Sequence, residues 1–145
     1  MSAAATLVDS IYDSALFEEV FAIGSQKITC IDNCYELINH LKKKHEVAYG
    51  ASVEFICADA RKLQDVFKEP CFDTIFDKGT FDTILAGDVS VNHAMKYLEE
   101  VNRILTNNGT FILLSTLDME LTNKYFKKVC IHMTSDELAN KSYRG

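Results

Sequence analysis

Short apolar runs alternate with helical patterns along the whole of this chain. Runs rich in β-branched and aromatic residues predict strands over 6–8, 27–31, 53–58, 72–76 and 110–115, with a sixth over 130–133. Neighbouring parallel strands need crossover connections, which are usually helices. The alternation therefore predicts an α/β fold, in which a mainly parallel sheet carries helices on both faces.

Apolar residues at helical spacing predict four helices between these strands. The first contains Leu16–Phe21 and is expected to stop at Gly24, because glycine is common just after a helix. The second begins near Leu37 and is expected to end in the basic turn 42–45, where cations suit the helix dipole. The third contains 91–105 and breaks at Asn107-Asn108-Gly109, and the last contains 121–129.

Composition limits the class of protein. At 145 residues, 48% of them hydrophobic, the chain has the size and the apolar content of one globular domain. Fifteen basic and 21 acidic residues give a net charge of −6, which argues against binding nucleic acid through bulk charge. No apolar stretch is long enough for a membrane span, and no basic region precedes the first apolar residues. We expect a single domain over 1–145 with a polar tail over 136–145, and neither membrane nor nucleic acid as a partner.

The cysteines and histidines do not form a metal-binding pattern. The five cysteines, at positions 30, 34, 57, 71 and 130, contain no C-x-x-C pair, and their odd number does not suit a disulfide framework. Cys30, Cys57 and Cys130 lie in apolar runs and are interpreted as small buried hydrophobic residues. The histidines are scattered, and His93 is expected to be a surface or capping residue. We predict a reducing compartment, the cytoplasm, and no metal.

Three successive strands are closed by an acidic residue, namely Asp32, Asp59 and Asp77. In a parallel sheet, ligands bind beyond the carboxyl ends of the strands, so these side chains could face a bound nucleoside. Asp32 could accept hydrogen bonds from ribose hydroxyls, and Asp59 could accept one from an adenine amine. Each aspartate could equally be a helix N-cap. The pattern leaves both interpretations open.

A more specific signal follows the fourth predicted strand. The stretch F-D-T-I-F-D-K-G-T-F-D over 72–82 resembles the signature of class I S-adenosylmethionine-dependent methyltransferases, nearest to the elongation factor 1-alpha lysine methyltransferases. Supporting motifs occur in the same order: I-T-C-I-D at 28–32, A-D-A-R-K-L at 58–63, and L-E-E-V-N-R-I-L at 98–105. The resemblance covers about 14–117. It implies a Rossmann-like class I methyltransferase fold and S-adenosylmethionine as the cofactor.

The resemblance also implies roles for particular residues. Asp32 and Asn33 correspond to the pair beside the ribose, and Asp59 and Ala60 to the pair beside the adenine. Lys78 and Gly79 belong to the hexad over 77–82, which lies at the cofactor in the family, and Asp77 would be the catalytic residue that faces the methyl group and orients the acceptor amine.

The chain departs from the family pattern at three places. Ser10 and Tyr12 stand where the family has glycines in its first loop, so Ser10 is the residue expected to face the cofactor there. Few residues precede Thr6, and no run after 133 resembles the final strand. An uncovered sheet edge would have to be paired, so we expect a homodimer or another protein partner.

Three functional hypotheses follow. The first is an active methyltransferase whose methyl acceptor is a protein lysine. The second is a methyltransferase fold without cofactor that acts as a protein-interaction module, as the replaced glycines suggest. The third is a truncated, inactive form. Binding of S-adenosylhomocysteine separates the first hypothesis from the second.

Overall fold

A computed structural model describes residues 5–9, 15–22, 24, 27–87 and 90–129. In this part of the chain five parallel strands form one sheet, in the order β3-β2-β1-β4-β5. They are β1 (Ala5–Asp9), β2 (Lys27–Asp32), β3 (Val53–Cys57), β4 (Phe72–Lys78) and β5 (Leu105–Leu114). The predicted α/β class and the parallel sheet are confirmed.

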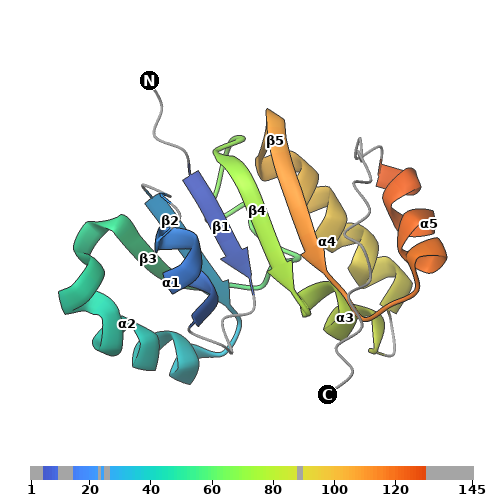
Figure 1. Ribbon diagram of the computed structural model, residues 1–145. Helices are drawn as coiled ribbons and strands as arrows, with labels where there is room; N and C mark the ends of the chain where they lie inside the picture. Colours follow the sequence, from blue (N-terminus) through green and yellow to red (C-terminus); the bar gives the residue numbers. More distant parts are fainter. Residues whose placement is uncertain (1–4, 10–14, 23, 25–26, 88–89, 130–145) are drawn as a thin grey trace, which may run out of the picture.

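Helices connect the strands, as the alternation predicts, except between β3 and β4, which are joined by a loop (Figure 1). They are α1 (Ala15–Ala22), α2 (Tyr35–Tyr49), the short 3-10 helix η1 (Gly50–Ser52), α3 (Thr80–Leu85), α4 (Ser90–Ile104) and α5 (Met119–Val129). Gly24 follows α1 with φ of 107°, a conformation that glycine adopts readily, so the predicted stop is confirmed. The sixth strand over 130–133 and the tail over 136–145 lie outside the described residues.

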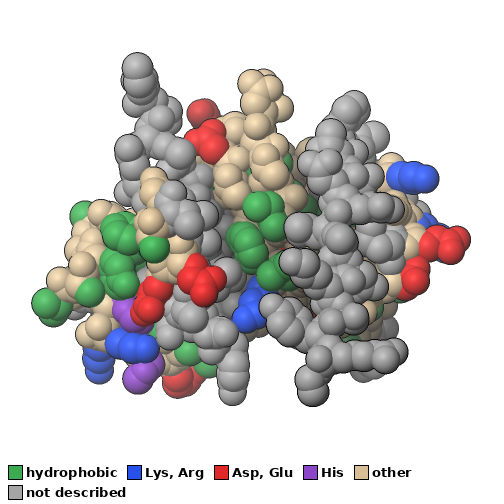
Figure 2. Space-filling model, viewed as in Figure 1, with side chains coloured by type: hydrophobic (Ala, Val, Ile, Leu, Met, Phe, Trp, Pro, Cys, Tyr) green, Lys and Arg blue, Asp and Glu red, His purple; other side chains and the backbone are tan. Residues whose placement is uncertain are grey.

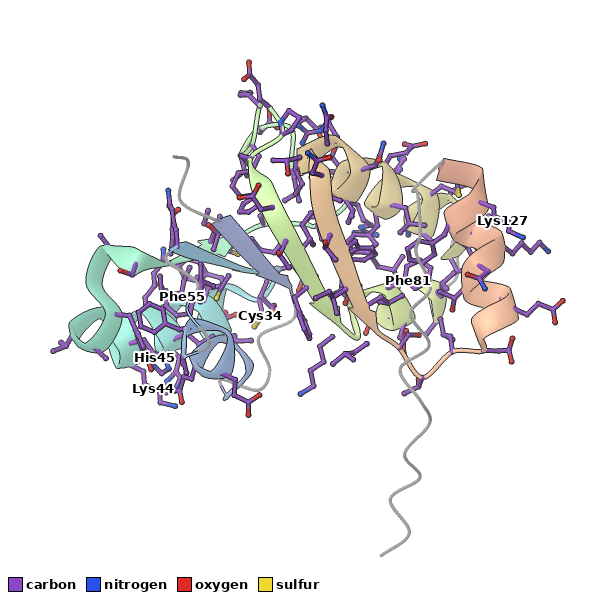
Figure 3. All side chains as sticks on the ribbon, turned by 45° about the horizontal axis from the view of Figure 1, so that its top comes forward. Cys34, Lys44, His45, Phe55, Phe81 and Lys127 are labelled. Atoms are coloured by element: carbon purple, nitrogen blue, oxygen red, sulfur yellow. The ribbon has the colours of Figure 1, made fainter. Side chains whose placement is uncertain are left out.

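Two apolar clusters cover the two faces of the sheet, because successive side chains of a strand point to opposite faces. In β2, Ile28 and Cys30 pack with residues of α2 and β3, whereas Ile31 belongs to the cluster that includes α3, α4 and α5. Figure 3 shows His45 and Phe55 in the first packing layer and Phe81 in the second, beside α5. Helices therefore cover both faces.

Helix α2 is longer than its sequence pattern predicts. It continues to Tyr49, so the expected end in the basic turn 42–45 is wrong. Leu41, His45 and Tyr49 are four residues apart and share one helix face; His45 is only 4% exposed, and the Tyr49 ring lies 5.1 Å from that of Phe21. A buried histidine and a half-buried tyrosine therefore extend the packed face of the helix beyond the apolar residues that predicted it. The lysines remain exposed, and Figure 2 shows basic, histidine and acidic side chains together at this end of the molecule.

Strand β5 begins earlier than predicted and contains an irregularity. Phe72 of β4 pairs with Leu105, but Thr74, only two residues further, pairs with Thr110. The expected break of the helix at Asn107-Asn108-Gly109 is therefore wrong: α4 already ends at Ile104, and these three residues form an irregularity within β5. A Cβ at Gly109 would lie 2.7 Å from Cγ and Cδ1 of Leu105 and 3.0 Å from the Thr106 carbonyl oxygen.

Replacement of Gly109 is expected to destabilise the fold. In Gly109→Ala the new methyl group must displace Leu105 or the backbone, which costs about 1–3 kcal/mol of unfolding free energy. Urea denaturation of the two proteins measures this difference. Gly87→Ala is the matched control, because its Cβ would meet only the Ile84 carbonyl oxygen at 3.5 Å, an ordinary contact. Equal losses in both variants would contradict the prediction.

The cysteines follow the sequence interpretation only in part. Cys30 is fully buried, and burial raises the pKa of its thiol to about 12. Cys57 ends β3 and is exposed, so its predicted burial is wrong, and Cys130 lies outside the described residues. The four described cysteines are free thiols. None of the helices within the described ranges has the length and apolar character that a membrane crossing requires.

Candidate functional site

A pocket lies at the carboxyl end of the sheet. The chain runs outward from β1 to β2 and β3 and then returns to β4 on the other side of β1, which makes a topological switch point of the kind where α/β folds bind ligands. The pocket has a volume of about 280 Å³. Its lining includes four residues that the sequence singled out: Asp32, Asn33, Asp59 and Ala60.

Asp32 ends β2 and organises the loop that follows. Its Oδ1 accepts a hydrogen bond from the Cys34 backbone N–H at 2.8 Å, and its carbonyl oxygen accepts one from the Ala58 N–H at 3.0 Å. The second bond joins the end of β2 to the loop after β3, and these two segments supply Asp32 and Asp59 to the same pocket. Parallel pairing of β2 with β3, with Asp32 opposite Cys57, explains why two residues 27 positions apart in sequence meet there.

Asp59 is held by an arginine two residues later in the chain. Nε and Nη2 of Arg61 donate to Oδ1 and Oδ2 of Asp59, each at 2.8 Å, and the Arg61 backbone N–H donates to Oδ1 at 2.9 Å. Nη1 of Arg61 lies 3.0 Å from Nδ1 of His93 in the first turn of α4. Hydrogen bonds from Arg61 hold the pKa of the Asp59 carboxyl below its usual range, although partial burial opposes them. Asp59 therefore stays ionised.

Sequence reasoning missed part of the pocket wall. Arg61 and His93 both line the pocket, so His93 is more than the surface or capping residue that was expected. The remaining lining residues come mainly from α3 and its flanks: Ala58, Thr80, Thr83, Ile84 and Gly87. The A-D-A-R motif contained a signal for Arg61, because a cation two residues after an acid at a strand end can fold back onto it. Nothing in the sequence marked α3 as a separate helix.

The carboxylate of Asp77 points into the protein interior. It is 0% exposed and accepts hydrogen bonds from the N–H groups of Thr80 (2.8 Å) and Phe81 (3.0 Å) and from the Tyr97 hydroxyl (2.9 Å). Burial raises its pKa to about 6, although these three hydrogen bonds act in the opposite direction. Asp77 does not belong to the pocket lining. It holds the start of α3 against α4, and its catalytic role stays a prediction.

The second aspartate of the hexad holds a different loop. Asp82 accepts hydrogen bonds from the hydroxyl of Ser115, from the Thr116 N–H at 2.8 Å and from the Thr116 hydroxyl at 2.9 Å. Burial alone would raise the pKa of Asp82, but these hydrogen bonds together lower it. The two aspartates of the hexad thus fix α3 to α4 and to the loop after β5.

The other expected cofactor residues lie near this turn or outside the described ranges. Lys78 is the exposed last residue of β4, and Gly79 precedes α3 with φ of 92°, a conformation that side-chain-bearing residues rarely adopt. Neither contributes to the pocket lining. Ser10 and Tyr12 lie outside the described residues. A cofactor role for Ser10, Lys78 and Gly79 stays a prediction.

The motif over 98–105 also has a structural function. Glu100 accepts hydrogen bonds from the Leu63 N–H and, in a bidentate pair, from Nε and Nη2 of Arg103 at 2.8 Å each. Nη1 of Arg103 donates to the Phe67 carbonyl oxygen at 2.7 Å. This cluster holds the segment from Leu63 to Phe67 on α4, away from the pocket lining. Within the described residues no group of His, Cys, Asp and Glu side chains has the arrangement of a metal site.

The chain matches the family model described as "Methyltransferase domain" over residues 12–143. The chain belongs to this methyltransferase family. The match to the family covers most of this chain, including the pocket residues from Asp32 to His93.

The curated relatives that the chain resembles, at low sequence identity, are also methyltransferases. Over 114 residues, 77% of this chain, the sequence is 28% identical to the eEF1A lysine and N-terminal methyltransferase of Xenopus laevis, and covers 16% of that protein. Over 112 residues, 72% of the chain, it is 29% identical to EEF1A lysine methyltransferase 4 of Mus musculus, and covers 42% of it. The chain thus spans less than half the length of both relatives.

Solved structures agree on the fold. The [4+2]-cyclase SpnF superposes with a TM-score of 0.62 and 16% identity, over 76% of this chain and 38% of that one. A S-adenosylmethionine-dependent methyltransferase from Clostridium acetobutylicum has a TM-score of 0.57 and 17% identity, over 74% and 41% of the two chains. The Rossmann-like class I fold is therefore confirmed for this methyltransferase domain.

Proposed function

We propose that this methyltransferase domain binds S-adenosylmethionine in the pocket lined by Asp32 and Asp59 and transfers its methyl group to a protein lysine. The observation that carries the proposal is the meeting of these two carboxylates, from the ends of β2 and β3, in one pocket at the switch point. The names of the relatives, which include lysine methyltransferases of eEF1A, support a protein lysine as the acceptor. We also propose a cytoplasmic location, by analogy with such a substrate.

The chemical groups of the pocket fit an adenosine. Two carboxylates supply acceptors for ribose hydroxyls and for an exocyclic amine, while Ala58, Ala60 and Ile84 supply apolar surface for the faces of a purine. Oδ1 of Asp32 already accepts the Cys34 N–H, which leaves Oδ2 for the ribose hydroxyls. The volume of about 280 Å³, formed by described residues, is near the lower end for small-molecule sites.

The bound cofactor would supply a methyl group to a neutral acceptor amine. The new N–C bond would form as the C–S bond breaks, S-adenosylhomocysteine would leave, and the methylated amine would lose a proton to solvent. The task of the protein is then to hold the two reactants in line, and such positioning is worth roughly 7–11 kcal/mol of the barrier. Within this proposal Asp32 and Asn33 bind the ribose side, and Asp59 and Ala60 the adenine. Asp77 keeps Lys78, Gly79 and α3 in place, and acts on the acceptor amine only if the buried carboxylate becomes accessible.

Titration with S-adenosylhomocysteine tests the proposal. A ligand that binds only the folded state stabilises it, by about 2.7 kcal/mol at a concentration 100 times Kd. For a domain of this size the thermal midpoint is expected to rise by roughly 5–10 °C. Asp32→Ala removes the carboxylate that would bind the ribose, so the rise is expected to disappear at the same ligand concentration.

Two further variants separate binding from folding. Asp32→Asn keeps an acceptor for the Cys34 N–H, so its unliganded midpoint should stay closer to that of the wild type than the midpoint of Asp32→Ala. Asp65→Ala removes an exposed aspartate outside the pocket lining and should respond to ligand as the wild type does. A wild-type protein whose midpoint does not move at millimolar ligand would refute cofactor binding and favour the interaction module.

A further inference from the structure

Three side chains on the pocket wall form a continuous hydrogen-bonded chain. Asp59 and Arg61 come from the loop after β3, and His93 comes from the first turn of α4, 32 residues after Arg61. All three line the pocket, and both members of the ion pair are about one third exposed, with side-chain exposures of 32% for Asp59 and 30% for Arg61. These three hydrogen-bonded side chains therefore join two walls of one pocket and are accessible to a ligand in it.

The hydrogen bonds from Arg61 determine which oxygen of Asp59 can still accept a hydrogen bond from a ligand. Oδ1 already accepts two bonds, from Nε and from the backbone N–H of Arg61, whereas Oδ2 accepts one, from Nη2. A carboxylate oxygen has two lone pairs, so the remaining acceptor site of Asp59 lies on Oδ2. The bidentate pair fixes the plane of the carboxylate and therefore the direction of that site.

His93 fixes the other end of the guanidinium. An arginine can only donate, so Nδ1 of His93 accepts from Nη1 at 3.0 Å, and the ring hydrogen is on Nε2. Arg61 therefore has three of its side-chain N–H groups committed, two to Asp59 and one to His93. A guanidinium held at both ends stays in one orientation, and it therefore fixes the orientation of the Asp59 carboxylate plane as well.

The geometry points to Arg61 and His93 as positioning residues that make this pocket select a 6-aminopurine nucleoside over a 6-oxopurine one. The oriented Oδ2 of Asp59 accepts from an exocyclic amine, whereas a carbonyl oxygen in the same place would face it with two acceptors and no hydrogen. The inference rests on the proposed function, because it concerns the nucleoside part of the same cofactor. The lowered pKa of Asp59 supports it, since a protonated Asp59 could donate to a carbonyl and would lose the distinction.

The test compares two ligands that differ only at the 6-position of the base and at the neighbouring N1, which carries a hydrogen in the 6-oxo form. Isothermal titration measures the binding of S-adenosylhomocysteine and of S-inosylhomocysteine, in which a carbonyl oxygen replaces the exocyclic amine. The wild-type protein is expected to prefer the adenosyl compound by about tenfold or more, the usual scale for one hydrogen bond to a charged group. Arg61→Lys keeps the charge but loses the two-pronged contact, and should reduce the preference to about threefold or less.

Variants of His93 add an independent readout. In His93→Gln the amide oxygen can still accept from Nη1 of Arg61, so the preference should be retained. In His93→Leu it should fall towards that of Arg61→Lys. The matched control is Arg103→Lys, because Arg103 makes the same bidentate pair with Glu100 at 2.8 Å, with a side-chain exposure of 31%, but does not line the pocket. It should lower stability without changing the preference.

The outcomes distinguish the inference from the proposed function. If the wild-type protein binds both ligands equally, or if Arg61→Lys keeps the full preference, the selecting role of Arg61 is refuted while cofactor binding stands. If Arg103→Lys lowers the preference as much as Arg61→Lys, the effect is one of general stability and the inference fails. If the wild-type protein binds neither ligand, the proposed function itself fails.

Discussion

Asp77→Asn is expected to remove most of the fall in stability that the wild-type protein shows between about pH 4 and pH 6. The Asp77 carboxyl is 0% exposed, and its pKa is raised from 3.8 to about 6. Between these values the unfolded chain has lost the Asp77 proton while the folded protein still binds it, so the unfolding free energy falls as the pH rises. The difference in pKa corresponds to about 3 kcal/mol. Urea denaturation of both proteins at intervals from pH 3.5 to pH 7.5 measures it.

The informative quantity is the wild-type free energy minus that of Asp77→Asn. This difference is expected to be most favourable to the wild type below pH 4, to decrease through pH 6, and to be constant above it. Asparagine retains a carbonyl oxygen for the N–H of Thr80 or Phe81, so the variant should fold. A difference that is flat across this range would show that Asp77 ionises in the folded protein as easily as in water.

Asp82→Asn supplies a control of opposite sign within the same hexad. The pKa of Asp82 is lowered, because hydrogen bonds from Ser115 and Thr116 outweigh its partial burial. Its contribution to stability is therefore present above the ordinary pKa of 3.8 and is lost as the pH falls through the lowered value. The Asp82→Asn series therefore has to extend below pH 3.5. The stability difference should rise with pH below 3.8 for Asp82 and fall with pH between about 4 and 6 for Asp77, and slopes of the same sign would contradict the assignment of the hydrogen bonds.

Alternating runs in the sequence were sufficient to predict the sheet. Each expected strand up to 110–115 is present, since a buried parallel strand needs a continuous apolar run, which is hard to mistake. The order of the strands also brought Asp32 and Asp59 together, as the switch-point rule predicts. The Phe72 and Phe81 rings, with exposures of 3% and 0%, belong to the core beneath this sheet.

Features that depend on side-chain direction could not be predicted in this way. Asp59 and Asp77 both come at the end of an apolar run in the sequence. In the structure Asp59 lines the pocket, whereas Asp77 is buried under α3. The difference comes from Tyr97, which is 20 residues away on α4 and supplies a hydroxyl only when α4 packs on the sheet. The contact between Arg61 and His93 likewise forms only when α4 packs beside the loop after β3. Partners that meet only after packing leave no periodic signal in the sequence.

Phe81→Ala is expected to cost about 3–5 kcal/mol of unfolding free energy, the largest loss of any single truncation considered for this domain. Phe81 is 0% exposed, and its ring centroid lies 6.3 Å from that of Tyr97, 6.0 Å from Tyr125 and 5.8 Å from Phe126. Truncation leaves a cavity between α3, α4 and α5 that these rings fill only in part. The total free energy of unfolding of a small domain is about 5–15 kcal/mol, so the variant should unfold at a much lower urea concentration than the wild type.

The same variant tests whether Phe81 holds α5 in place. Tyr125 and Phe126 belong to α5, and Figure 3 shows Phe81 beside that helix. Limited proteolysis of Phe81→Ala should therefore cleave 119–129 earlier than elsewhere in the described chain. Phe81→Leu, which retains most of the buried volume, should lose less stability, and Tyr35→Ala, at a side chain 62% exposed, about 0.5 kcal/mol or less. If Phe81→Ala loses no more stability than Tyr35→Ala, Phe81 does not hold α3 and α4 against α5, and other contacts must hold that helix.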